Sequence, residues 1–278
     1  MSKPLPYPLI FTDLDGTLLD HHSYSAKPAD QLIEYLNDGS IASVIPITSK
    51  THAELQWLQR SLPFIDAISV TENGSVIHAP HGIPFSSADH PYRETLGVEY
   101  GEIFDQIARL PTDLRTHITG FHDMSVETVA QITGLSIDDA RRAQKREATE
   151  PFLWSGSNAE LQFLKTIFMD ASIYVQQGGR FYHCTGMATK EQAMGRVIAA
   201  FASRQPENRF CSIALGDGPN DLAMIEAADF GVIMPNPEGV TIQSDKVSVR
   251  TAPQPGPKGW VLAITEILAE LGFNLSQS

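Results

Sequence analysis

Residues 9–20, LIFTDLDGTLLD, begin with the apolar run Leu9-Ile10-Phe11 and continue into two aspartates, Asp13 and Asp15, separated by a single residue. The apolar run predicts a buried strand, which places the two aspartates at its carboxyl end. Two carboxylates held this close repel each other unless a cation or a shared proton neutralises them. Because hard divalent cations prefer oxygen ligands, this stretch predicts a metal site at the end of a strand.

The two residues after the aspartate pair suit a phosphate ligand. Gly16 permits a tight turn and a close approach of the backbone to a ligand. Thr17 adds a hydroxyl group and a backbone N–H at the same turn. The stretch therefore predicts that metal and phosphate bind next to each other.

Composition excludes several classes of partner. With 278 residues, of which 42% are hydrophobic, the chain can bury one large core or one core with a smaller inserted domain. The net charge of −13 and the absence of any Lys or Arg run argue against nucleic acid and against an anionic membrane surface as partners. An anionic ligand must then be held by local geometry and a metal ion.

The expected location is a reducing cytoplasm. Cys184 and Cys211 have no metal-ligand spacing and are expected to be small core residues. The N-terminal residues lack the pattern of a signal peptide, and no stretch approaches the roughly 18 apolar residues of a membrane span.

The first third of the chain alternates strand-like and helix-like periods, as in parallel β-α-β units. After the strand that ends at Thr12, an apolar stripe over residues 32–36 predicts a helix that stops at Gly39. A second strand is predicted over residues 41–47. Pro46 removes a backbone donor within it, so this strand is expected to end or bulge there.

From about residue 84 the pattern changes to that of a separate α+β layer. The predicted elements are helices near 103–110, 126–132 and 161–167 and a hairpin that pairs 172–176 with 180–184. After residue 185 the alternation of helix and strand resumes. We therefore expect a discontinuous α/β core domain formed by residues 1–84 and 186–278, with a smaller domain inserted over residues 85–185.

A second acidic motif, GDGPND over residues 216–221, follows another apolar strand and contributes Asp217 and Asp221. The carboxyl ends of parallel strands meet at one edge of an α/β sheet, so these acids can converge with Asp13 and Asp15. In isolation the second motif is more typical of a surface turn, and aspartates that cap helices are common after strands. Taken together, the two motifs indicate an oxygen-only site that suits Mg²⁺.

Two further residues fall at the same predicted edge. Thr48 follows the second strand, and Lys190 begins the helix that precedes the second motif. Single threonines and lysines are usually capping or solvated residues. Beside these aspartates, however, a cation can offset carboxylate charge and a hydroxyl group can hold a phosphoryl oxygen.

These motifs resemble those of the haloacid dehalogenase-like superfamily of aspartate-nucleophile phosphohydrolases. The resemblance rests on residues 13–17, Thr48, Lys190 and residues 216–221. It implies a Rossmann-like parallel-sheet core with an inserted α+β cap of the C2B type, which this superfamily's sugar-phosphate phosphatases and eukaryotic phosphomannomutases share. Residues 48–51, 71–74 and 176–183 look specifically like mannosyl-3-phosphoglycerate phosphatases.

The resemblance implies a role for each motif residue. Asp13 would be the nucleophile that forms an aspartyl phosphate, and Asp15 the acid and base that moves the proton. The Mg²⁺ ligands would be the Asp13 side chain, the Asp15 carbonyl and Asp217, with Asp221 ligating or steadying a water. The expected phosphate-binding residues are Thr17, Thr48, Lys190 and Asn220.

Selectivity for a small phosphoester is expected to lie in the cap. Arg180 is the first candidate to bind a phosphoglycerate carboxylate, with His183 and Lys50 behind it. Asn73 is the candidate for sugar hydroxyls. Each has a plainer alternative, since Arg180 can be a solvated hairpin residue, His183 a core histidine and Asn73 the turn former before Gly74.

Three functions agree with this pattern. The first is Mg²⁺-dependent hydrolysis of mannosyl-3-phosphoglycerate or another sugar phosphate. The second is a phosphomannomutase-like phosphotransferase on the same scaffold. The third is a binding protein without catalysis, although such a protein would not need a proton-transferring Asp15 beside Asp13.

Overall fold

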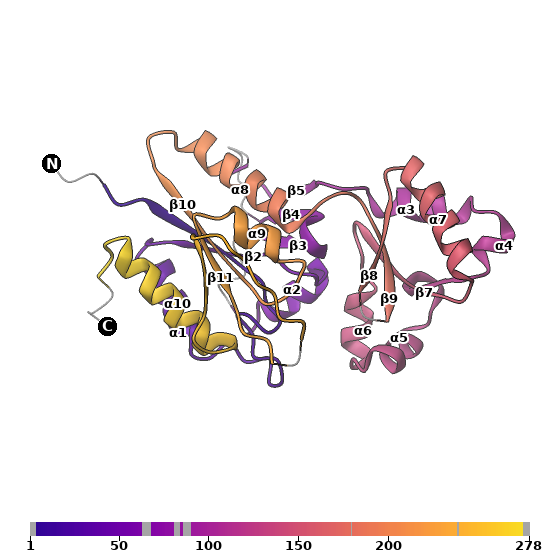
Figure 1. Ribbon diagram of the computed structural model, residues 1–278, viewed down its shortest axis with the longest axis horizontal. Helices are drawn as coiled ribbons and strands as arrows, with labels where there is room; N and C mark the ends of the chain where they lie inside the picture. The colour runs from indigo at the N-terminus through magenta and orange to yellow at the C-terminus, as the bar shows by residue number, and fades with distance from the viewer. Residues whose placement is uncertain are drawn as a thin grey trace.

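The computed structural model describes residues 4–62, 68–80, 84–85, 90–178, 180–237 and 239–274. Two bodies lie side by side in Figure 1. The larger is built from both ends of the chain, and the smaller from its middle, coloured magenta to salmon. The smaller body is therefore an insertion within the larger one.

A five-stranded parallel sheet forms the centre of the larger body, with the strand order β12-β11-β10-β1-β2. Its strands are β1 (Tyr7–Thr12), β2 (Ser43–Pro46), β10 (Phe210–Gly216), β11 (Phe230–Ile233) and β12 (Val249–Thr251). The chain first moves from β1 to β2 and later returns on the other side of β1. The strand order thus reverses between β1 and β10. In open α/β sheets, ligands bind at the carboxyl ends of the strands at such a point.

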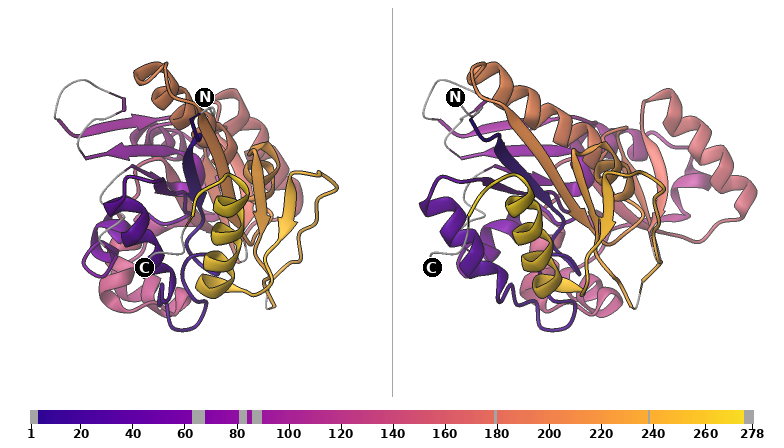
Figure 2. Two further views of the ribbon diagram at one scale, coloured as in Figure 1. Left: turned by 90° about the vertical axis from the view of Figure 1, so that its left-hand side faces the viewer. Right: turned by 60° about the vertical axis from the view of Figure 1, so that its left-hand side comes forward.

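Helices cover both faces of this sheet. The helices are α1 (Ala29–Asp38), α2 (His52–Leu58), α8 (Lys190–Arg204), α9 (Leu222–Ala227) and α10 (Gly256–Glu270). Ile10 packs with α1, α2 and α10, whereas its neighbour Phe11 packs with α8 and α9 on the opposite face. Figure 2 shows α10 in yellow beside α1 in purple on one side of the sheet. Burial on both faces explains why β1 is a continuous apolar run rather than an alternating one.

A small antiparallel sheet extends the core on the α8 side. Its strands are β3 (Ser69–Thr71), β4 (Val76–Ala79) and β5 (Tyr92–Thr95). Val70, Ile77 and Tyr92 pack in the same cluster as Phe11 and α8. The domain boundary predicted between residues 84 and 85 therefore falls between two strands of one core sheet.

The inserted body is a four-stranded antiparallel sheet with the order β6-β7-β9-β8. Its strands are β6 (Ile118–Gly120), β7 (Thr149–Trp154), β8 (Tyr174–Gly178) and β9 (Phe181–Thr185), and its helices are α3 (Tyr100–Ala108), α4 (Thr112–Arg115), α5 (Val126–Thr133), α6 (Ile137–Ala143) and α7 (Asn158–Asp170). Helices α3 and α7 pack with Phe152 and Cys184 of the sheet. The expected hairpin of β8 and β9 is present. We refer to this body as the cap.

Several local predictions are confirmed. Thr51 and Glu54 form a capping box at the start of α2. Strand β2 ends at Pro46, whose nitrogen lies on the side away from β1, because the next residue, Ile47, donates its N–H to the carbonyl oxygen of Thr12 at 2.8 Å. Cys184 and Cys211 are both buried and unpaired.

The predicted stop of the first helix at Gly39 is confirmed, with one difference in backbone conformation. Helix α1 ends at Asp38, but Gly39 has a right-handed φ of −76°, and Ser40 with φ +47° is the left-handed residue that turns the chain. Helix α10 starts at Gly256, within a proline-rich stretch, because Pro257 is tolerated in the first helical turn, where its missing N–H has no partner to lose. Within the described residues, no helix is long and apolar enough to cross a membrane.

Gly74 is a position where only glycine fits. Its φ is +100°, and a Cβ atom there would lie 2.3 Å from the carbonyl oxygen of Thr189, just before α8. We expect Gly74→Ala to lower the free energy of unfolding by about 3 kcal/mol or more, because left-handed strain of roughly 1–2 kcal/mol adds to a backbone clash. Urea denaturation measures this cost.

Gly134 offers a matched control, since it has φ +81° and nothing within 4 Å of a Cβ atom. Gly134→Ala should cost only about 1 kcal/mol, from backbone strain alone. Equal losses in the two variants would show that the contact between Gly74 and α8 does not constrain the fold.

Candidate active site

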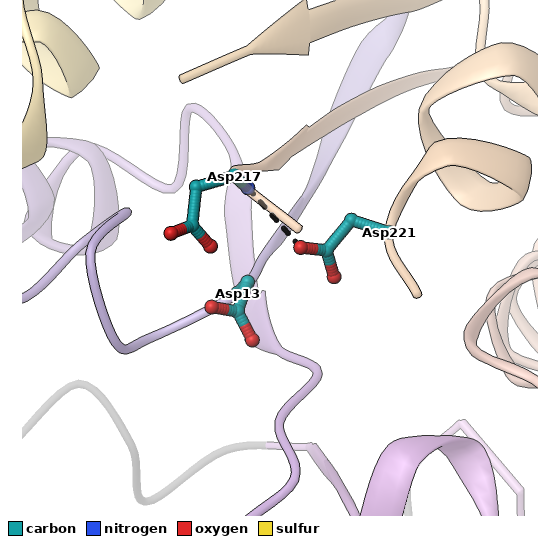
Figure 3. Close-up of side chains that lie close together, drawn as sticks. All are labelled: Asp13, Asp217 and Asp221. Carbon is teal, nitrogen blue, oxygen red and sulfur yellow. Dashed lines mark hydrogen bonds between the residues drawn. The ribbon is translucent and has the colours of Figure 1, made fainter. Parts of the chain in front are cut away.

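Asp13, Asp217 and Asp221 form an acidic cluster at the carboxyl edge of the parallel sheet. Each offers a carboxylate oxygen that lies within 4.8 Å of the others. Figure 3 shows the three side chains turned toward one another, Asp13 from the end of β1 and the other two from the loop after β10. Pairing of β1 with β10 brings them together, since the Asp13 N–H donates to Leu215 O at 2.9 Å.

Lys190 provides the positive charge within this cluster. Its Nζ lies 2.6 Å from Oδ1 of both Asp13 and Asp221, and its side chain is only 1% exposed. Although burial acts to lower it, the pKa of Lys190 is raised by the two carboxylates. The pKa of Asp13 rises to about 7, first because of burial and then because of Asp221, with Lys190 opposing both.

The loop over residues 216–221 is wrapped around Asp221. Oδ2 of Asp221 accepts the backbone N–H groups of Asp217 at 3.1 Å and Gly218 at 2.9 Å. Gly16 has φ +75°, and a Cβ atom there would lie 2.5 Å from Oδ2 of Asp217. The glycine of the first motif thus permits the second motif to lie against it.

The residues of the cluster fit a hard divalent cation. Three carboxylates face one ammonium group, which leaves negative charge in a largely buried site. The pKa of Asp217 is also raised, by burial first and by Asp221 second. All candidate ligand atoms are oxygens, as Mg²⁺ prefers, and Oδ1 of Asp13 is the oxygen committed to Lys190.

Asp15 lies beside the cluster and pairs with Lys50. The Lys50 Nζ is 2.8 Å from Oδ2 of Asp15, while Oδ1 of Asp15 is buried and without a hydrogen-bond partner among the described residues. Burial opposes protonation of Lys50, but the charge of Asp15 raises its pKa overall. Lys50 therefore contacts the aspartate expected to carry the proton.

The expected phosphate residues occupy different environments. Thr48 is fully buried; its hydroxyl oxygen accepts the Lys50 N–H at 3.2 Å, and its carbonyl oxygen accepts the Asn73 N–H at 2.8 Å. Asn220 and Asn73 are both exposed, and the Asn220 amide donates to Oδ1 of Asn73 at 3.0 Å. The hydroxyl group of Thr17 is fully buried without a partner among the described residues.

The two predicted cap residues, Arg180 and His183, differ in position. Arg180 is exposed and donates a hydrogen bond to the carbonyl oxygen of Ile132 at the end of α5, which is a contact within the cap. His183 lies on β9, partly buried, and its pKa is lowered to about 4 by burial first and by the charge of Arg146 second. The carboxylate-binding role of Arg180 is therefore a prediction without a supporting contact.

Three residues at the site have no counterpart in the sequence-based prediction. Asn236 donates to Oδ2 of Asp217 at 2.6 Å. Glu72 is buried, and its carboxylate accepts a hydrogen bond from the cap segment that follows Arg146. The guanidinium group of Arg146 donates to Ser49 O at 3.3 Å. A usable signal exists for Asn236, since it follows β11 at the same sheet edge as the acids. Glu72 and Arg146 act across the core–cap contact, which no local pattern reveals.

Comparisons with known proteins agree with this fold. Residues 171–251, which run from the cap hairpin to β12, match the family model described as haloacid dehalogenase-like hydrolase. The fold is also that of a phosphatase of the same superfamily, BT1666 from Bacteroides thetaiotaomicron, with a TM-score of 0.62, 16% identity, and coverage of 96% of each chain.

Two other solved structures share the fold over nearly their full length. The sucrose-phosphatase of Synechocystis sp. PCC6803, solved with sucrose and phosphate, has a TM-score of 0.57 and 16% identity over 98% of this chain and 100% of that one. The subclass IIB sugar phosphatase BT4131 has a TM-score of 0.58 and 17% identity over 95% of this chain and 99% of that one. The architecture of an α/β core with an inserted cap is therefore shared with haloacid dehalogenase-like structures.

Lys190→Met should destabilise the metal-free protein strongly. Removing the buried ammonium group leaves Asp13 and Asp221 without their cation, and breaking a buried pair in this way costs about 3–5 kcal/mol. Urea denaturation in EDTA at pH 7.5 measures the loss. Lys246→Met is the control, because Lys246 is 53% exposed and should change the free energy of unfolding by about 0.5 kcal/mol or less. Similar losses in both variants would contradict a buried charge balance.

His183 should make the protein less stable in acid. Its pKa is about 4 in the folded chain and 6.5 in a model peptide, so the unfolded chain binds a proton that the folded chain does not. Stability is retained above pH 6.5 and falls as the pH drops toward 4, by about 3 kcal/mol at most. His183→Gln should remove this part of the pH slope. Parallel curves of unfolding free energy against pH for the two proteins would contradict the assignment.

Proposed function

We propose that this protein is a Mg²⁺-dependent phosphatase that hydrolyses a sugar-linked phosphate monoester through an aspartyl phosphate. The observation that carries the proposal is the buried cluster in which Lys190 joins Asp13 to Asp221, with Asp217 alongside. A phosphate ester needs a nucleophile and positive charge at one point, and this cluster offers both.

Asp13 is the proposed nucleophile. One of its carboxylate oxygens attacks phosphorus, and the bond from phosphorus to the leaving alkoxide breaks. Burial favours the neutral acid, but the hydrogen bond from Lys190 at 2.6 Å favours the carboxylate that the attack requires. Mg²⁺ held by Asp13, Asp217 and Asp221 would supply further positive charge to neutralise the phosphate.

Asp15 is the proposed acid and base. As a carboxylic acid it gives its proton to the leaving alkoxide, and as a carboxylate it then takes a proton from the water that attacks the aspartyl phosphate. That attack releases phosphate and restores Asp13. The unpartnered Oδ1 supports this role, since it is the oxygen that Lys50 does not engage.

The proposed substrate class is a sugar or glycosylated glycerate phosphate. Two proteins with this fold are named a sucrose-phosphatase and a sugar phosphatase, which supports the class at the level of fold. Within it, the resemblance of residues 48–51, 71–74 and 176–183 to mannosyl-3-phosphoglycerate phosphatases favours mannosyl-3-phosphoglycerate. The exposed amides of Asn73 and Asn220, which contact each other beside Thr48 and the 216–221 loop, suit sugar hydroxyls.

Phosphate release from a panel of phosphoesters tests the proposal. The panel holds mannosyl-3-phosphoglycerate, sucrose 6-phosphate, mannose 6-phosphate and 3-phosphoglycerate, each with Mg²⁺ and with EDTA. We expect release only with Mg²⁺, and we expect Asp13→Asn to lower kcat by a factor on the order of 10⁴ or more, because an amide is not a nucleophile here. Asp15→Asn should leave a slowly hydrolysed phosphoenzyme that mass spectrometry detects.

Asp38→Asn is the matched control, because Asp38 is an exposed carboxylate at the end of α1 and should leave kcat unchanged. Failure to release phosphate from any of these esters in Mg²⁺ would refute the phosphatase proposal. Transfer of labelled phosphate to a second sugar, in place of release, would identify a phosphotransferase.

A further inference from the structure

Arg146 is a cap residue whose guanidinium group reaches the active-site edge of the core. It lies in the segment between α6 and β7, and its Nη1 donates to the carbonyl oxygen of Ser49 at 3.3 Å. Ser49 stands between Thr48 and Lys50, two residues that line the proposed phosphate and proton-transfer site. A cationic group of the cap therefore lies next to the residues that would hold the substrate.

The charge of Arg146 is not matched by an ion pair. No carboxylate among the described residues forms a salt bridge with it, and its Nε is buried without a hydrogen-bond partner. Its neighbours on α6 differ, since Arg141 pairs with Asp138 at 2.6 Å and Arg142 with Asp139 at 2.5 Å. A guanidinium group that keeps free donors beside a phosphate-binding site is suited to an anion that arrives with a ligand.

The nearest buried acid of the cap is already engaged. Glu150 interacts with the charge of Arg146, but its carboxylate accepts hydrogen bonds from the Tyr100 hydroxyl and the His122 N–H, each at 2.9 Å. Burial raises the pKa of Glu150, which weakens its value as a counter-ion. The positive charge of Arg146 also acts on His183 of β9, whose pKa is lowered by burial first and by Arg146 second.

The core itself holds Arg146 in place. The carboxylate of Glu72 accepts hydrogen bonds from the cap residues directly after Arg146: the Glu147 N–H at 2.7 Å, the Ala148 N–H at 3.2 Å and the Thr149 hydroxyl at 2.5 Å. Glu72 is buried and has a left-handed φ of +51° in the same turn as Asn73. The backbone next to Arg146 is thereby fixed relative to the core, which reduces the entropy lost when its side chain binds a ligand.

The geometry points to Arg146 as a specificity-determining residue that binds a second anionic group of the substrate, a carboxylate or a second phosphate, while the first phosphate lies at Asp13 and Lys190. This inference rests on the proposed phosphatase function. Its planar fork of donors matches either anion with two parallel hydrogen bonds. Arg180, the residue favoured by sequence, instead contacts the Ile132 carbonyl oxygen.

Two matched substrate pairs test the inference in the intact enzyme with Mg²⁺. The first pair is 3-phosphoglycerate and glycerol 3-phosphate, and the second is glucose 1,6-bisphosphate and glucose 6-phosphate. We expect the wild-type enzyme to prefer, in at least one pair, the member that carries two anionic groups. Arg146→Gln should lower kcat/KM for that member by about 10- to 100-fold, mainly through KM, and by less than about 3-fold for its partner. Arg146→Lys should retain part of the preference.

The affected pair identifies the anion, since a loss confined to the first pair indicates a carboxylate and one confined to the second indicates a phosphate. Arg141→Gln is the control, because it removes an exposed, paired cap arginine and should leave both preferences unchanged. The thermal midpoint of each variant shows that it is folded.

Other outcomes overturn the inference. If Arg146→Gln slows both members of a pair equally, Arg146 only joins the cap to the core, and the phosphatase proposal still stands. If Arg180→Gln removes the preference and Arg146→Gln does not, the residue that binds the second anionic group is Arg180. If the wild-type enzyme releases no phosphate from any ester, both this inference and the proposed function fail.

Discussion

Parallel pairing of β1 with β10 is the constraint on which the rest of this structure depends. The two strands belong to distant parts of the sequence, yet their register places Thr12 opposite Leu215, so that each strand ends in an acid at the same sheet edge. Carboxylates gathered in this way are unstable by themselves, and Lys190 offsets part of their charge from the start of α8. The charge that is left over is what makes the edge suitable for a divalent cation.

The turn after β3 links this chemistry to the cap. Its left-handed residues Glu72 and Asn73 make different contacts. Glu72 accepts hydrogen bonds from the backbone of the cap, whereas Asn73 forms hydrogen bonds with Thr48 and Asn220 of the core. Gly74 completes the turn by lying against the start of α8. Because one turn contacts both bodies, the position of the cap is coupled to the edge where Lys190 and the acids lie.

Local sequence signals fix the ends of the elements they act on directly. Thr51 with Glu54, Ser136 and Thr189 begin helices, because their side-chain oxygens satisfy free N–H groups within one turn. The end of β2 at Pro46 was predictable because proline lacks the backbone N–H that a continuing strand donates. Strand β5 was not predicted as part of the core, because its partly exposed residues have a place there only through pairing with β4. The ion pair of Lys50 with Asp15 was not predicted either, because it joins residues from the ends of two different strands.

The sequence alone determined which acids gather at the sheet edge. Two acidic motifs after apolar strands, with Thr48 and Lys190, were sufficient to predict a convergent oxygen site, because parallel strands end on one side of a sheet. Only the tertiary structure decided which of the two cap arginines, Arg146 or Arg180, contacts the core beside that edge. Arg146 reaches Ser49, while Arg180 lies against α5, and the difference depends on contacts such as those of Glu72 with residues 147–149. These contacts join segments far apart in the chain, so no periodicity or spacing encodes them.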